Sequence, residues 1–147
     1  MEVDLVLSRS LHALVATLDR AADRILGTDF DISYSQFLTL YAVSVLDGGT
    51  QREIAAWLGT TESAVSRSVR GLAVDGLASI GPSASGGHRR SVEVTSRGHH
   101  LVTSAGTHLE RRLADVLAAA DVGYEDYAVM TGRLLAAVAG AAPRGLT

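Results

Sequence analysis

Residues 50–77 of this 147-residue chain are TQREIAAWLGTTESAVSRSVRGLAVDGL, and they contain the clearest start and stop signals for helices in the sequence. Thr50 and Glu53 form a capping box, in which each side chain accepts a hydrogen bond from the other residue's backbone N–H, so they predict the start of a short helix. Gly59 predicts the end of that helix, and Thr60 is expected to cap a second helix a few residues later. Two helices joined by so short a turn are typical of a helix-turn-helix.

The second of these helices is expected to have an apolar inner face and a polar outer face. Val65, Val69 and Leu72 recur with helical spacing and should point inward. In a helix-turn-helix the second helix enters the DNA major groove, where hydroxyl and guanidinium groups contact phosphates and base edges. The alternative is a solvated face on a structural helix pair. The outward positions are Thr61, Glu62, Ser63, Ser66, Arg67 and Arg70.

Two further helices are predicted before this stretch. Residues 7–25 carry one apolar stripe at steps of three and four, and the segment 27–31 should end that helix. A heptad-like stripe near a terminus favours packing against a partner subunit, with intramolecular packing as the alternative. Residues 33–36 form a capping box for the next helix, which the glycines at 48–49 end. The stripe consists of Leu7, Leu11, Leu14, Leu18, Ala21 and Ile25.

A two-stranded hairpin is predicted after the helix pair. Residues 77–80 and 89–95 have strand patterns, and the segment 81–88 between them is a loop rich in glycine and serine. Arg89 and Arg90 follow the glycine-rich tip, and a flexible arm with arginines suits the narrow minor groove of DNA, where negative potential is enhanced. The alternative is an ordinary solvated hairpin.

Two helices complete the predicted fold. Thr95 should cap a long fifth helix, which residues 121–123 end, and a last helix should stop near Pro143. The expected fold class is therefore mainly α: a winged helix-turn-helix lobe with N- and C-terminal helices that can form a dimer. No internal repeat interrupts this order.

Composition and charge agree with a DNA-binding protein only locally. All thirteen basic residues are arginine, sixteen residues are acidic, and the net charge is −3. Residues 50–100 nevertheless contain six arginines against four acids, and phosphate contacts need only a local basic surface. The absence of cysteine excludes disulfides and thiol redox sensing. The absence of a long apolar run and of a basic N-terminal region predicts a cytoplasmic protein without a signal peptide or transmembrane helix.

Patterns for catalysis and metal binding are weak. The sequence lacks a Gly-rich phosphate loop and a G-x-S-x-G elbow, and the pair Ser104 and His108 lacks an orienting partner. A His-Glu-x-x-His pattern is also missing, which favours surface histidines over a metal site. The chain is expected to be neither an enzyme nor a carrier of a cofactor or metal. The histidines are His12, His88, His99, His100 and His108.

The chain resembles the MarR family of bacterial regulators. The resemblance rests on the helix-turn-helix stretch quoted above, the hairpin, the sequence VTSRG and the long helix that follows. It implies one domain over residues 1–147, with a DNA-binding lobe at 31–99 and interlocking dimerisation helices at 1–30 and 100–147. By position, it also implies recognition-helix contacts to DNA and one phosphate contact at the helix start. These recognition-helix contacts are Ser63, Ser66, Arg67 and Arg70, and the phosphate contact is Thr61.

The predicted wing departs from the family pattern. MarR-like wings usually carry an Asp-x-Arg motif, but an ungapped alignment places Gly86 and His88 at those positions. With a shifted gap, Arg89 or Arg90 takes the place of the arginine and no aspartate precedes it. Ile80 stands where the family commonly has an arginine. Arg89 and Arg90 are therefore the candidate wing contacts.

The resemblance implies a homodimeric repressor on a pseudo-palindromic operator, released by a small aromatic or anionic effector. Tyr34, Phe37, Tyr41 and Trp57 are aromatic candidates for lining an effector site, although positions in the core are favoured for them. The sequence itself does not define the pocket. The alternative function is a winged-helix protein-interaction module that has lost DNA binding, which the missing Asp-x-Arg motif and the negative net charge favour.

Overall fold

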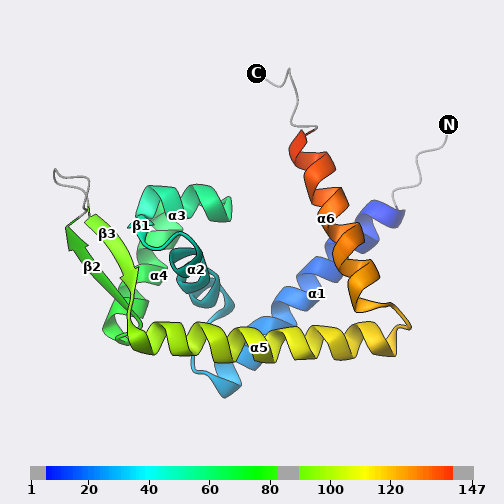
Figure 1. The fold of residues 1–147 in the computed structure, drawn as a ribbon, viewed down its shortest axis with the longest axis horizontal. Coiled ribbons are helices and arrows are strands. Elements are labelled where there is room, and N and C mark those ends of the chain that lie inside the picture. The colour runs from blue at the N-terminus through cyan, green and yellow to red at the C-terminus, as the bar shows by residue number, and fades with distance from the viewer. Residues whose placement is uncertain (1–5, 83–89, 141–147) are drawn as a thin grey trace. The chain divides into compact units, whose positions relative to one another are not determined.

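The computed structural model describes residues 6–82 and 90–140 (Figure 1). These residues form six helices and three short strands in the order α1, α2, β1, α3, α4, β2, β3, α5, α6, so the predicted mainly α winged-helix fold is confirmed. The chain divides into two compact units, Met1–Thr107 and His108–Thr147. The first unit contains the helix-turn-helix and the hairpin.

Helix α1 (Val6–Asp29) contains the predicted apolar stripe and continues through Gly27. Leu26, which lies outside that stripe, is fully buried and anchors the C-terminal end of α1 in the core. Asp31 then adopts a left-handed conformation with φ of 53°, which redirects the backbone into α2 (Tyr34–Val45). The helix therefore ends inside the predicted break, but two residues after the glycine.

Both predicted capping boxes are present. At the start of α2, the Gln36 N–H donates to the Ser33 hydroxyl and the Ser33 N–H donates to the Gln36 side-chain oxygen, each over 3.1 Å. At the start of α3 (Gln51–Leu58), the Thr50 N–H donates to Glu53 Oε2 over 2.7 Å. These pairs satisfy backbone donors that the first helical turn leaves free, so they fix where each helix begins.

The hairpin belongs to a small antiparallel sheet. Strands β2 (Ala78–Pro82) and β3 (Arg90–Val94) form the predicted hairpin, with ends shifted by about one residue from the prediction. A two-residue strand, β1 (Gly49–Thr50), pairs with the other edge of β3, so the sheet order is β1-β3-β2. The sequence did not predict β1, because two residues are too short to show an alternating pattern.

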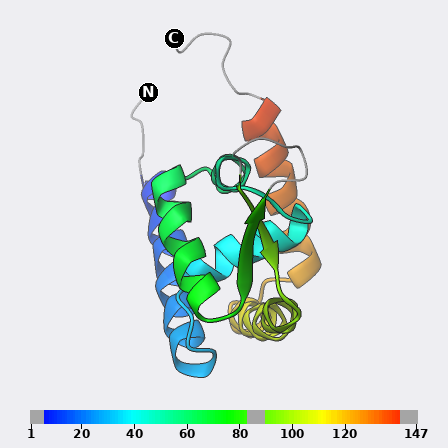
Figure 2. The same ribbon diagram turned by 90° about the vertical axis from the view of Figure 1, so that its left-hand side faces the viewer.

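The core of the first unit lies between the helix-turn-helix, α2 and the sheet. Helix α4 (Glu62–Val74) packs against α2, α3 and β2, and the hairpin lies beside it (Figure 2). Ala55 is buried where α3 approaches α4 and leaves room for close helix packing. The fully buried side chains include Leu26, Leu40, Val43, Ile54, Val65, Val69, Leu72 and Val92.

Helices α5 (Ser96–Ala119) and α6 (Tyr124–Gly140) complete the described residues. Thr95 caps α5 as predicted, because the Gly98 N–H donates to the Thr95 hydroxyl over 3.1 Å. In the second unit, the Tyr124 hydroxyl donates to Glu110 over 2.7 Å, and this bond to a carboxylate raises the pKa of Tyr124. Within the described residues, the structure contains no helix both long and apolar enough to cross a membrane.

Candidate nucleic-acid interface

The two faces of α4 differ as the sequence predicts. Val65, Val69 and Leu72 are buried on the inner face. On the outer face, Ser63, Thr61 and the two arginines are exposed, whereas Ser66 is half-buried. Exposed hydroxyl and guanidinium groups on the second helix of a helix-turn-helix have the chemistry that phosphates and base edges require. The exposed arginines are Arg67 and Arg70.

The cap of α4 corrects one prediction. Thr61, not Thr60, caps the helix, because the Thr61 hydroxyl accepts from the Ala64 N–H over 3.2 Å. Gly59 is left-handed, with φ of 64°, and ends α3. The Thr60 N–H donates back to the Ala55 carbonyl oxygen over 3.0 Å, so residue 60 belongs to the close of α3 rather than to the start of α4.

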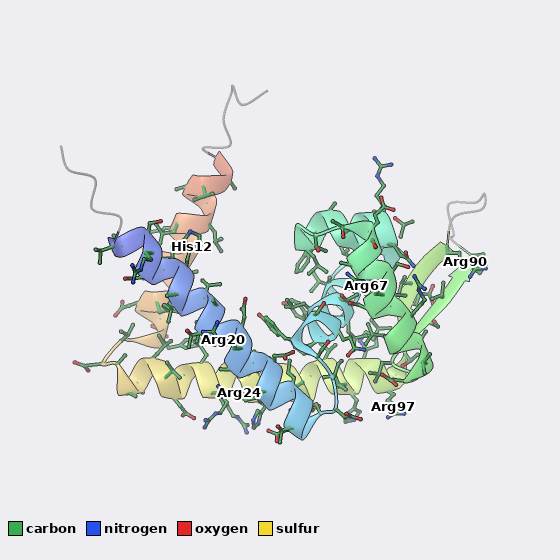
Figure 3. All side chains as sticks on the ribbon, turned by 180° about the vertical axis from the view of Figure 1, so that it is seen from behind. His12, Arg20, Arg24, Arg67, Arg90 and Arg97 are labelled. Carbon is green, nitrogen blue, oxygen red and sulfur yellow. The ribbon has the colours of Figure 1, made fainter. Side chains whose placement is uncertain are left out.

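The two arginines of α4 are held differently. Arg70 Nη2 donates to the Ser66 hydroxyl over 3.2 Å, and Arg70 Nε lies 3.4 Å from the Ser66 carbonyl oxygen. These bonds lay the Arg70 side chain back along its own helix. Arg67 is exposed on the same helix, and Figure 3 shows it together with Arg90 on the neighbouring hairpin.

The described part of the hairpin contributes one of the two predicted wing arginines. Arg90 is exposed and pairs with Pro82 at the distal end of the described strands. Arg89 lies outside the described residues, and so do Gly86 and His88, the residues that the ungapped alignment places at the Asp-x-Arg positions of the family. Ile80 is half-buried and pairs with Val92, so an apolar side chain packs into the sheet where MarR-like proteins commonly have an arginine.

The aromatic residues of α2 and α3 are only partly in the core. Phe37 is buried and Tyr34 is half-buried, but 42% of Tyr41 and 46% of Trp57 is exposed, so the prediction of core positions is wrong for these two. Tyr41 stacks on Phe37 with ring centroids 6.4 Å apart and meets the edge of Trp57 at 6.1 Å. The sequence offered one signal: Trp57 falls outside the apolar stripe of its short helix.

Tyr34 lies where α2 meets the end of α1. Its backbone N–H donates to the Asp23 carboxylate over 2.8 Å. Burial raises the pKa of the Tyr34 hydroxyl, and the nearby charge of Asp19 raises it further. The bond from the Tyr34 N–H to Asp23 therefore ties the start of α2 to α1.

The described histidines do not come together with other ligands to form a metal site. His12, His99 and His100 are exposed, and across residues 6–82 and 90–140 no three His, Asp or Glu side chains come together in a way that could hold a metal ion.

The helix pair with its buried inner face, the polar outer face of α4 and the adjoining hairpin define a winged helix-turn-helix. Residues 30–91 match the model of the MarR family. This segment contains the winged helix-turn-helix, and the predicted resemblance is confirmed over it. No curated protein matches the sequence significantly.

Solved structures share the fold over nearly the whole chain. BldR from Sulfolobus solfataricus, a transcriptional regulator, is 22% identical, with a TM-score of 0.78 over 90% of this chain and 94% of BldR. MepR from S. aureus in complex with DNA is 23% identical, with a TM-score of 0.74 over 95% of this chain and 99% of MepR. A mutant MarR from E. coli complexed with operator DNA is 20% identical, with a TM-score of 0.71 over 87% and 90% of the two chains.

Replacing the capping threonine tests the corrected start of α4. Thr61→Ala should lower the free energy of unfolding by about 1 kcal/mol, because the Ala64 N–H loses its acceptor. Thr60→Ala should change it by less than about 0.5 kcal/mol. Urea unfolding at one fixed protein concentration, followed by the fluorescence of Trp57, measures both variants. A larger loss of unfolding free energy in Thr60→Ala than in Thr61→Ala would instead identify Thr60 as the cap of α4.

Proposed function

We propose that this chain is a DNA-binding transcription regulator that inserts α4 into the major groove. The single observation that supports this function is the outer face of α4, where Arg67 and the neighbouring polar side chains are exposed on a helix whose inner face is fully buried. The rigid scaffold fixes the backbone of α4, so the exposed groups can be presented in a reproducible geometry. The proposed contacts on this helix are Thr61, Ser63, Ser66, Arg67 and Arg70.

The wing adds a second proposed contact. Arg90 is exposed at the distal end of the described hairpin, beside the helix-turn-helix. A guanidinium group inserted into a narrow minor groove gains from the enhanced negative potential there. Arg89 is proposed for the same role from its place in the sequence. Contacts to both grooves require double-stranded DNA, which is the proposed partner, and the cytoplasm is the proposed location.

Removing one guanidinium group tests the DNA-contacting face. Arg67→Ala should weaken operator binding by about 1–3 kcal/mol if Arg67 makes a bidentate contact to a base, and should relax sequence preference at that base pair. If Arg67 contacts only a phosphate, binding to all sequences should weaken alike. Fluorescence anisotropy with upstream intergenic DNA and a scrambled duplex, at two salt concentrations, separates these results.

Arg112→Ala is the matched control, because Arg112 is exposed in the second unit and pairs with Asp115 at 3.7 Å. It should leave operator affinity unchanged. Unchanged affinity in Arg67→Ala would contradict the assignment of Arg67. If the wild-type protein shows no preference for any upstream DNA, the protein-interaction module becomes the better explanation of the fold.

We further propose that the regulator is a homodimer that represses by occupying a pseudo-palindromic operator. In α1, Leu7, Leu11 and Leu14 are exposed, and in α6 Leu134 and Leu135 are exposed as well. Large exposed apolar residues that repeat along a helix mark an interaction surface, because their burial stabilises association by about 25 cal/mol per Å². A two-fold dimer would present two recognition helices to half-sites about one DNA turn apart.

Charges placed on the exposed face of α1 test the dimer. The double substitution Leu11→Glu and Leu14→Glu should convert the dimer into a folded monomer, because burial of two unpaired carboxylates opposes association. Operator affinity should fall with it. Val74→Glu, at a position that is 87% exposed in α4, is the control for oligomeric state and should remain dimeric. Light scattering distinguishes the species, and an unchanged dimer in the double variant would exclude this face of α1.

The exposed aromatic pair favours an aromatic ring in the small effector that the resemblance implies. Tyr41 and Trp57 expose ring surface, and Tyr41 also stacks on the buried Phe37, so an added ring could pack against an ordered aromatic platform. An effector of this kind would release the operator only if it binds one conformation of the regulator more tightly than the other.

Benzoate serves as a probe of this effector site. It should change the fluorescence of Trp57 in a saturable way and should weaken operator binding, whereas acetate, which lacks the ring, should do neither. Tyr41→Ala should abolish the saturable change without unfolding the protein, since Tyr41 is 42% exposed. A response that persists in Tyr41→Ala, or that is absent from the wild-type protein, would contradict an aromatic-anion site here.

A further inference from the structure

Thr95 lies between β3 and α5 and makes more connections than a helix cap requires. Its hydroxyl accepts from the Gly98 N–H over 3.1 Å, which is the ordinary capping interaction. The same hydroxyl donates to the Gly76 carbonyl oxygen over 2.8 Å. In addition, the Thr95 N–H donates to the Leu77 carbonyl oxygen over 3.1 Å. One residue therefore binds the start of α5 to two backbone carbonyls that precede β2.

Those two carbonyls belong to the segment that closes α4. Gly76 is left-handed, with φ of 69°, which ends the helix and turns the chain. The Leu77 N–H donates to the Leu72 carbonyl oxygen over 2.8 Å, and Leu77 itself is buried. The position of this segment is therefore fixed by α4, and Thr95 holds it from the other side.

Gly98 brings the first turn of α5 into direct contact with the same segment. Gly98 is buried, and a Cβ atom there would lie 2.1 Å from the Leu77 carbonyl oxygen and 2.7 Å from a methyl group of Val94. The backbone of α5 thus approaches the start of β2 more closely than any side chain would permit. The Thr95 hydroxyl lies at this close approach and makes both of its hydrogen bonds to backbone groups, the Gly98 N–H and the Gly76 carbonyl oxygen.

We propose that Thr95 is a positioning residue that holds α4 and the β2–β3 hairpin in one fixed orientation for DNA recognition. The proposal rests on the proposed function. The hairpin begins next to Leu77 and ends at Val94, so the end of α4 and both inner ends of the hairpin meet at Thr95. Sequence-specific binding requires α4 and the wing to fit their grooves at the same time, whereas nonspecific phosphate contacts tolerate some rotation between them.

The test replaces the hydroxyl and keeps the shape of the side chain. Thr95→Val leaves the Gly98 N–H and the Gly76 carbonyl without their partner. The ratio of affinities for the operator and for a scrambled duplex should fall on the order of tenfold, with affinity for the scrambled duplex unchanged. Thr95→Ser, which keeps the hydroxyl, should retain the wild-type ratio.

Thr103→Val is the matched control, because the Thr103 hydroxyl donates only within α5, to the His99 carbonyl oxygen over 3.0 Å. It should retain the wild-type ratio. A purely stabilising role for Thr95 would lower the folded fraction and weaken both affinities alike, which leaves their ratio unchanged. Thr95→Ala removes the same hydrogen bonds in a smaller residue and replaces Thr95→Val if the valine variant does not fold.

The outcomes separate this proposal from the proposed function. If the wild-type protein discriminates the operator but Thr95→Val and Thr95→Ala discriminate it equally well, Thr95 has no positioning role and the proposed function stands. A lowered ratio in Thr95→Ser as well would also exclude the hydroxyl as the cause. If the wild-type protein itself does not discriminate, the proposed function fails, and the positioning role fails with it.

Discussion

Helix α4 crosses α2 at a point where one glutamine side chain serves two purposes. The Gln36 side-chain oxygen accepts from the Ser33 N–H and so completes the cap of α2. The amide nitrogen of Gln36 lies beside Gly71, and a Cβ atom at position 71 would lie only 2.6 Å from that nitrogen. Because the cap restrains the glutamine, α4 can approach α2 this closely only with a glycine at position 71. The orientation of α4, and therefore of every exposed residue on it, depends on this crossing.

The features that the sequence predicted correctly are those that short-range chemistry decides. The capping boxes at Ser33 and Thr50 are formed by residues three apart, so their geometry needs no knowledge of the rest of the chain. The inner face of α4 follows from helical spacing alone, and Val65, Val69 and Leu72 are buried as expected. Most of the candidate DNA contacts could be placed on the outer face for the same reason.

The features that it missed depend on neighbours distant in sequence or on competing local bonds. Strand β1 exists only because β3 offers a free edge to residues 49–50. Thr60 has the side chain of a helix cap, but its N–H is already used to close α3, so the cap falls to Thr61. Tyr41 repeats the spacing of Phe37 along α2, yet it is exposed, because the ring of Trp57 that it meets is itself exposed and does not bury it.

The hydrogen bonds between Arg70 and Ser66 affect which donors the outer face of α4 can offer to DNA. A guanidinium group has five N–H donors, and Arg70 directs two of its nitrogens at Ser66. Donors therefore remain for a phosphate, and the charge is already held close to the helix, which lowers the conformational entropy lost when that contact forms. Arg67 is exposed and must be ordered on binding, but its donors are available for a base edge. In the proposed interface, Arg70 is thus the better candidate for a phosphate contact, which positions the helix, and Arg67 for a base contact, which provides the selectivity.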